Sequence, residues 1–136
     1  VAIGTSHGAY KFKGKSRLDI ERLKKIAVLV KKPLVLHGAS GVRQDMKKLA
    51  EKYGAKLGAA RGVSDSDIKA AVQNGVAKVN MDTDLRLAFT AGVRQSVGTM
   101  PEEIDPRKIL KPASDLITEV AMQKMKLLGS AGKIES

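Results

Sequence analysis

Two histidines stand where they could help to hold a metal ion. His7 comes shortly after the apolar run Val1–Ile3, and His37 directly follows the run Pro33–Leu36. If both runs are strands of a parallel sheet, ligands bind beyond their carboxyl ends. Two imidazoles suit a borderline cation such as zinc, but a catalytic zinc takes three protein ligands. The sequence has two histidines and no cysteine, so another segment must complete such a site.

Glycines beside these histidines could let the backbone approach an anion. Gly8, Gly38 and Gly41 have no side chain to keep a ligand at a distance, and Ser40 adds a hydroxyl donor. The pattern resembles a cradle for a phosphate group. The alternative is that these glycines simply end strands.

A third apolar run, Val76–Val79, leads into a cluster of polar residues. Asn80, Asp82, Thr83 and Asp84 offer amide, carboxylate and hydroxyl groups directly before a helical pattern. Asp or Thr at this place can cap a helix, which would account for one of them. The whole cluster indicates a polar site at this third strand end.

The elements that must position these residues alternate between strand and helix. The three apolar runs read as buried parallel strands, because they are nearly continuous. The apolar periodicity predicts helices over 19–30, 44–53, 64–74 and 85–96, and from Pro112 to just before Gly129, with a loop over 98–111. Such a chain is α/β, with right-handed crossovers. Three strands cannot close a barrel, so we expect residues 1–136 to be the C-terminal piece of something larger.

Composition narrows the classes of partner. Twenty-five Lys and Arg against 14 Asp and Glu give a net charge of +11, which favours phosphorylated metabolites, nucleic acid or acidic lipid. Aromatic residues make up 3% and Trp is absent, so stacking platforms for nucleic acid are few. No apolar run reaches the roughly 20 residues that span a bilayer, and we see no secretory signal. The expected location is the cytoplasm, without a membrane or nucleic-acid partner.

Three motifs in register resemble the class II fructose-1,6-bisphosphate aldolases. Residues 4–11, 33–41 and 78–88 are similar to the last three strand ends of that family. Residues 105–108 and 125–133 resemble its C-terminal tail, so the similarity covers essentially the whole chain.

The resemblance implies a (β/α)8 TIM barrel. Residues 1–136 would be the C-terminal segment of one TIM-barrel aldolase domain and would supply strands six to eight. The N-terminal part of the same barrel would bring a third zinc-binding histidine and the aspartate that donates a proton. The resemblance also implies a homodimer or homotetramer.

The resemblance further implies a set of site residues. His7 and His37 would bind the catalytic Zn²⁺, and Asn80 and Asp82 would be catalytic, with Asn80 holding the enediolate end of the substrate. Residues that bind substrate or phosphate would be Gly8, Lys11, Gly38, Ala39, Ser40, Asn80, Met81, Asp82, Thr83, Arg86 and Arg107.

Three of these positions carry more specific expectations. Thr83 would contact a phosphate, Arg86 would lie near the far end of the bisphosphate, and Arg107 would reach the second phosphate of a neighbouring subunit. Carbonyls near Ser6, Gly8 and Gly38 would correspond to a site for a monovalent cation, Na⁺ or K⁺.

The implied reaction is the reversible cleavage of fructose 1,6-bisphosphate to dihydroxyacetone phosphate and glyceraldehyde 3-phosphate. Zinc would polarise the ketone and stabilise the enediolate. One rival is the sister activity on tagatose 1,6-bisphosphate, although the intact motif Asn80–Asp84 favours fructose. A Schiff base on Lys78 is another mechanism. A half-barrel without its complementing segment would be inactive.

Overall fold

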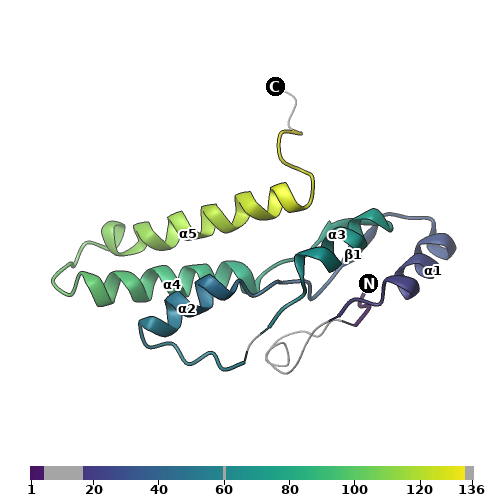
Figure 1. Ribbon diagram of the computed structural model, residues 1–136. Coiled ribbons are helices and arrows are strands. Elements are labelled where there is room, and N and C mark those ends of the chain that lie inside the picture. Colours follow the sequence, from purple (N-terminus) through teal and green to yellow (C-terminus); the bar gives the residue numbers. More distant parts are fainter. Residues whose placement is uncertain (5–16, 60, 134–136) are drawn as a thin grey trace. The chain divides into compact units, whose positions relative to one another are not determined.

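A computed structural model describes residues 1–4, 17–59 and 61–133 of this chain. The chain forms two compact units, each built from two stretches of sequence. The strand unit consists of residues 1–41 and 59–81, and the helical unit consists of residues 42–58 and 82–136 (Figure 1). The chain therefore passes between the units after Gly41, after Gly58 and after Met81.

The strand unit contains four regular elements among its described residues, which are α1 (Ile20–Val30), β1 (Leu34–Leu36), α3 (Asp65–Gln73) and β2 (Val76–Val79). The two strands pair in parallel, with Leu34 opposite Val76 and Leu36 opposite Val79, and an irregularity follows Leu34. Parallel neighbours need a long crossover, and α2 (Gln44–Lys52) and α3 both lie between them in sequence. The predicted α/β class is confirmed, and both strands end at the same edge of the sheet.

The predicted first strand is not a regular strand. The amino group of Val1 donates to the carbonyl of Val35, and the carbonyl of Val1 accepts the N–H of His37 at 3.2 Å. The ladder stops there, because the carbonyl of Ile3 instead accepts the N–H of Asp19 at 2.9 Å. The apolar run Val1–Ile3 thus lies along β1 for one residue, and Ile3 is buried as part of the core.

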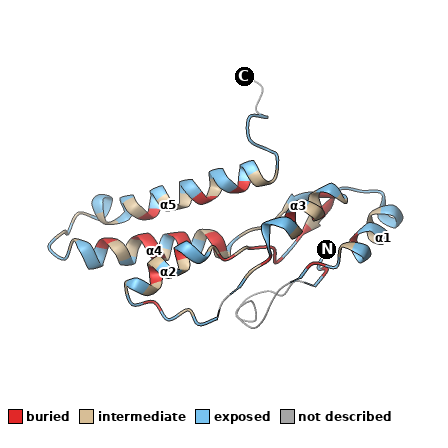
Figure 2. Ribbon diagram, in the orientation of Figure 1, coloured by how far each residue is buried: buried red, intermediate tan, exposed pale blue. Residues whose placement is uncertain are grey.

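Helix caps and buried aliphatic residues hold the strand unit together. Asp19 caps α1 by accepting the N–H of Arg22 at 2.9 Å, and Ser64 caps α3 by accepting the N–H of Asp67 at 3.1 Å. α3 packs against β2 and α1. Figure 2 colours the buried residues red. The fully buried side chains of this unit include Ile3, Leu23, Leu36, Val63 and Ile68.

The described part of the helical unit contains α2 (Gln44–Lys52), α4 (Thr83–Thr99) and α5 (Pro106–Leu127). α4 and α5 lie side by side in opposite directions, and α2 packs against α4 (Figure 1). A Cβ on Gly92 would lie 2.4 Å from the Cα of Ala113, so glycine permits the close contact of α4 with α5. Within the described residues, we find no helix long and apolar enough to cross a membrane.

The predicted start of the last helix is wrong. Residues 106–111 belong to α5 instead of a loop, and Pro112 lies inside the helix. Asp105 caps α5 by accepting the N–H of Arg107 at 2.9 Å, and Pro106 occupies the first helical position, where its missing N–H costs nothing. The internal proline removes one helical hydrogen bond. Packing against α4 offsets this loss, since the neighbouring Ala113 is buried.

Candidate functional site

The carboxyl ends of β1 and β2 bring His37 and Asn80 together. The backbone N–H of Asn80 donates to the carbonyl of Leu36 at 2.9 Å, which continues the strand pairing by one residue. The side-chain nitrogen Nδ2 of Asn80 lies 3.3 Å from Nδ1 of His37. An imidazole and an amide from residues 43 positions apart therefore share one edge of the sheet.

The chemistry of this pair fits one ligand of a zinc site. An amide can turn so that its oxygen accepts Nδ1–H, and an imidazole in that tautomer has an unprotonated Nε2 that can bind a metal ion. His37 is an exposed residue, so an ion can reach it. The described residues contain no cluster of three or more His, Asp or Glu that could hold a metal alone. His7, the other predicted ligand, lies outside the residues that the structure describes.

The loop after β1 is built of small buried residues. Ala39 and Ser40 are 0% and 1% exposed, and Gly38 has a φ of +68°, a conformation that side chains with a Cβ rarely adopt. The carbonyl of Ser40 accepts the N–H of Val63 at 3.1 Å. Sequence reasoning selected the loop residues 38–40 but missed the Gly62–Val63 segment that contacts them. The only sequence feature at this segment is a single glycine before a valine, which does not by itself predict a contact with residues 38–40.

The polar cluster after β2 is split between the two units. Asn80 and the half-buried Met81 belong to the strand unit, whereas Asp82 and Thr83 begin the helical unit. Asp82 precedes α4 without a side-chain cap bond, and its Oδ1 accepts Nε–H of Arg86 at 2.9 Å. Helix capping therefore does not explain the carboxylate of Asp82. The N-terminus of α4 carries a partial positive charge that favours anions.

Arg107 lies at the first turn of α5 and is held by a neighbouring acid. Its side chain is 89% exposed, and its Nη2 lies 2.8 Å from Oδ2 of Asp105. This hydrogen bond lowers the pKa of Asp105 and raises the pKa of Arg107. The guanidinium is thus fully charged and accessible to an anion.

Sequence reasoning also missed an ionic cluster in the helical unit. Arg43, directly before α2, donates from Nη2 to Glu119 at 2.8 Å and from Nη1 to Gln123 at 2.8 Å, and it bonds Asp45. The side chain of Arg43 is only 18% exposed. No local pattern marks a contact between residues so far apart in sequence.

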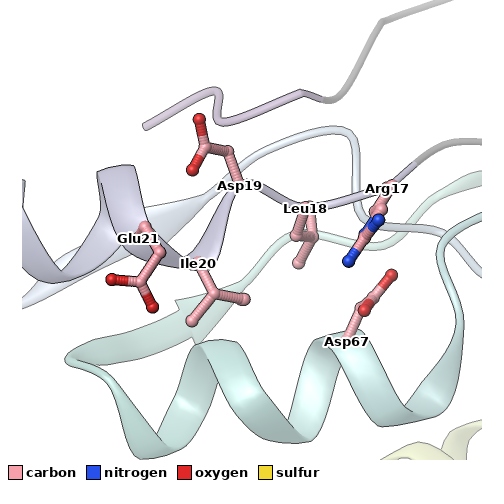
Figure 3. Close-up of a pocket in the computed structure, with 6 residues that line it drawn as sticks. All are labelled: Arg17, Leu18, Asp19, Ile20, Glu21 and Asp67. Carbon is pink, nitrogen blue, oxygen red and sulfur yellow. The ribbon is translucent and has the colours of Figure 1, made fainter.

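Two further observations bear on alternative sites. An open cavity lies at the N-terminus of α1, where Arg17 points toward Asp67 (Figure 3). Its lining includes none of the predicted site residues, and three carboxylates against one arginine disfavour a phosphate there.

Lys78 on β2 is exposed within the described part of the chain, whereas a Schiff-base lysine needs desolvation.

Several predicted site residues lie outside the described part of the chain. They are Ser6, His7, Gly8 and Lys11. Of the others, the strand unit carries residues 37–40, 80 and 81, and the helical unit carries Asp82, Thr83, Arg86 and Arg107.

Comparisons with known proteins agree on one family. The family described as "Fructose-bisphosphate aldolase class-II" matches residues 1–133. A fructose-bisphosphate aldolase of Thermus caldophilus is 53% identical over 133 residues, which cover 98% of this chain and 44% of the relative. One from Giardia intestinalis is 49% identical, over 97% of this chain and 42% of the relative.

A solved structure supports the same assignment. The YdjI aldolase from Escherichia coli K12 matches with a TM-score of 0.68 and 32% identity, over 98% of this chain and 41% of that one. The chain thus spans less than half the length of these relatives. The matching family, the identity of the relatives and the strand-end residues together show that the chain belongs to the class II fructose-bisphosphate aldolase family.

Proposed function

We propose that this chain is the C-terminal portion of a zinc-dependent fructose-1,6-bisphosphate aldolase and supplies strands six to eight of its (β/α)8 barrel. The observation that carries the proposal is the pair His37 and Asn80, 3.3 Å apart at adjacent parallel strand ends. In parallel α/β folds this edge is where substrates bind. The relatives named as fructose-bisphosphate aldolases support the reaction.

Some residues of this chain would bind the metal ion, and others would bind the substrate. His37 would bind zinc together with His7 and a third histidine from the N-terminal part of the barrel. When bound, zinc would polarise the substrate ketone and stabilise the negative charge left as the C3–C4 bond breaks. Asn80 would donate from its amide to the oxygen at the enediolate end, and Asp82 would accept from a substrate hydroxyl.

The phosphate groups would bind backbone and cationic groups of this chain. Gly38, Ala39 and Ser40, with Gly8 and Lys11, would bind the first phosphate. Met81 and Thr83 would belong to the substrate-binding set, with Thr83 contacting a phosphate. Arg86 and Arg107 would reach the second phosphate, Arg107 in a neighbouring subunit of a homodimer or homotetramer. Exposed ion pairs contribute about 0–1 kcal/mol, so a phosphate can displace Asp82 from Arg86 and Asp105 from Arg107 at little cost. A monovalent cation, Na⁺ or K⁺, would bind near Gly38.

Metal dependence tests the central proposal. We expect the full-length protein to lose bisphosphate cleavage when a chelator removes its metal and to regain it when zinc is added. A protein that is untouched by chelation, or that is trapped on Lys78 by borohydride in the presence of substrate, would contradict the zinc mechanism. Magnesium in place of zinc is the matched control for simple charge screening.

The substrate and the assembly need separate tests. We propose fructose 1,6-bisphosphate over its tagatose isomer because residues 80–84 retain the Asn-Met-Asp-Thr-Asp motif, and a higher kcat/KM for the tagatose isomer would refute this choice. Intact-mass measurement would show whether the remaining barrel strands are present. A lone 14.5 kDa chain without activity would identify an inactive half-barrel instead. The cytoplasm stays a prediction.

A further inference from the structure

The segment Gly62–Val63 lies against the loop that follows β1. A Cβ on Gly62 would lie 2.2 Å from the carbonyl oxygen of Ser40 and 2.4 Å from the carbonyl carbon of Gly41. Both of these atoms belong to the backbone, so they cannot turn aside as a flexible side chain could. The next N–H, that of Val63, donates to the same Ser40 carbonyl at 3.1 Å. The close approach of the Gly62 backbone and the hydrogen bond from Val63 therefore constrain the backbone of Ser40 from one side.

The segment is itself anchored in the core of the strand unit. Val63 is 2% exposed, and Ser64 directly after it caps α3. α3 buries Ile68 and packs against β2. The loop after β1 is thus held by its own strand and, through Gly62–Val63, by the helix that precedes the neighbouring strand.

We infer that Gly62–Val63 is a positioning element that sets the backbone of residues 38–41 for phosphate binding, and this inference rests on the proposed function. Gly62 would touch no substrate and would act through Ser40. Ordinary contacts to a Cβ begin at about 3.4 Å, so an added methyl would push the Ser40 carbonyl away by roughly 1 Å. Hydrogen bonds to an anion tolerate only a few tenths of an ångström in length, so a shift of this size breaks them.

The substitution Gly62→Ala tests this role in the full-length, zinc-loaded enzyme. The Kd for inorganic phosphate, measured by calorimetry, and the KM for the bisphosphate should both rise about 10- to 100-fold, as expected for losing one or two charge-assisted hydrogen bonds. We expect kcat to stay within about threefold, because phosphate contacts are made equally in the ground state and in the transition state. A loss of kcat with unchanged KM would overturn the inference.

The matched control is Gly92→Ala in the helical unit. Its Cβ would lie 2.4 Å from the Cα of Ala113, which is a similarly tight contact but one that lies wholly within the helical unit. This variant should melt at a lower temperature with KM and Kd unchanged. An equal rise of KM in both variants would show general destabilisation and would overturn the inference.

A second variant keeps the test decisive if Gly62→Ala does not fold. Val63→Ala loosens the segment without inserting any atom, and we expect a rise of about two- to fivefold in the Kd for phosphate. An unchanged Kd in folded Val63→Ala, or a wild-type KM in folded Gly62→Ala, would overturn the inference while the proposed function stands. If the wild-type enzyme binds no phosphate and cleaves no bisphosphate, the proposed function itself fails.

Discussion

The two units present their candidate site residues in different ways. In the strand unit the residues lie at strand ends and in a buried loop, where backbone contacts with Leu36 and Val63 decide their positions. In the helical unit Arg86 and Arg107 are 78% and 89% exposed, and each is paired with an acid on the same chain segment. The comparison indicates that backbone contacts hold the candidate residues of the strand unit, whereas the candidate arginines of the helical unit are exposed and are held only by neighbouring acids.

The units also differ in how they use charge for stability. In the helical unit, the largely buried Arg43 joins the start of α2 to Glu119 and Gln123 of α5. The two ion pairs that the described strand unit shows lie within the first turns of α1 and are exposed. Burial of aliphatic side chains is therefore the main source of stability in the strand unit, whereas the helical unit is also stabilised by the ionic cluster around Arg43.

The largest expected effect is the loss of stability when a core side chain of the strand unit is truncated. Leu36 on β1 is fully buried, so Leu36→Ala should lower the free energy of unfolding by about 2–5 kcal/mol, through lost burial and a residual cavity. Urea unfolding of the full-length protein measures this. The control Ile104→Ala, at a side chain 91% exposed in the helical unit, should change stability by less than about 0.5 kcal/mol. If both variants lost the same free energy of unfolding, the buried Leu36 would contribute no more to stability than the exposed Ile104, which would contradict the prediction.

The next prediction concerns the proposed catalytic role of Asn80 at the end of β2. Asn80→Ala should lower kcat about 10²- to 10³-fold, because a fixed donor to developing charge is lost. Lys78→Ala, two residues earlier on the exposed part of β2, should keep kcat close to the wild-type value. Steady-state rates of both variants with fructose 1,6-bisphosphate test whether Asn80 or Lys78 is needed for the reaction. The opposite ranking would favour Schiff-base chemistry.

A third pair of variants compares Arg43, which joins two helices of the helical unit, with Arg107, which we propose to bind a phosphate. Arg43→Met should lower the free energy of unfolding by about 1–3 kcal/mol, because Glu119 and Gln123 lose a partially buried partner. Arg107→Met should change stability by less than about 1 kcal/mol, since its ion pair is exposed, and should raise KM for the bisphosphate about tenfold. Thermal melts and KM values on both variants test this. A KM effect confined to Arg43→Met would reverse the assignment.

The smallest effect is a dependence of stability on pH. The hydrogen bond from Arg43 lowers the pKa of Asp45, so the folded state binds this proton less readily than the unfolded state. The stabilisation is present above the unfolded pKa, about 3.9, and is lost as the pH falls through the lower folded value.

Asp45→Asn should therefore reduce the loss of stability on acidification by less than about 1 kcal/mol, because the carboxylate is half-exposed. Urea unfolding at pH 7 and at pH 3 measures the difference. An unchanged pH dependence in this variant would show that the ionic cluster around Arg43 does not depend on Asp45.

From α1 onward the order of the elements could be predicted, because it depends on local patterns. Apolar runs end in polar residues at 37 and 80, and Ser64 with Asp67 marks the start of α3, as the structure confirms. The predicted start of the last helix differs from that of α5, although Asp105 and Pro106 form a good helix N-terminus. The pattern favours Pro112 as the start, because a proline usually begins a helix instead of lying inside one.

Short stretches of chain suffice to predict the α/β class, the resemblance to one family and the residue types at each strand end. Three contacts could be seen only in the folded chain: Asn80 lies beside His37, Arg43 reaches Glu119, and Gly62 lies against Ser40. Such contacts join residues far apart in sequence, and their closeness follows from how helices and strands pack. Hydrophobic periodicity predicts which side of an element is buried, but it carries no information on which partner is buried against it.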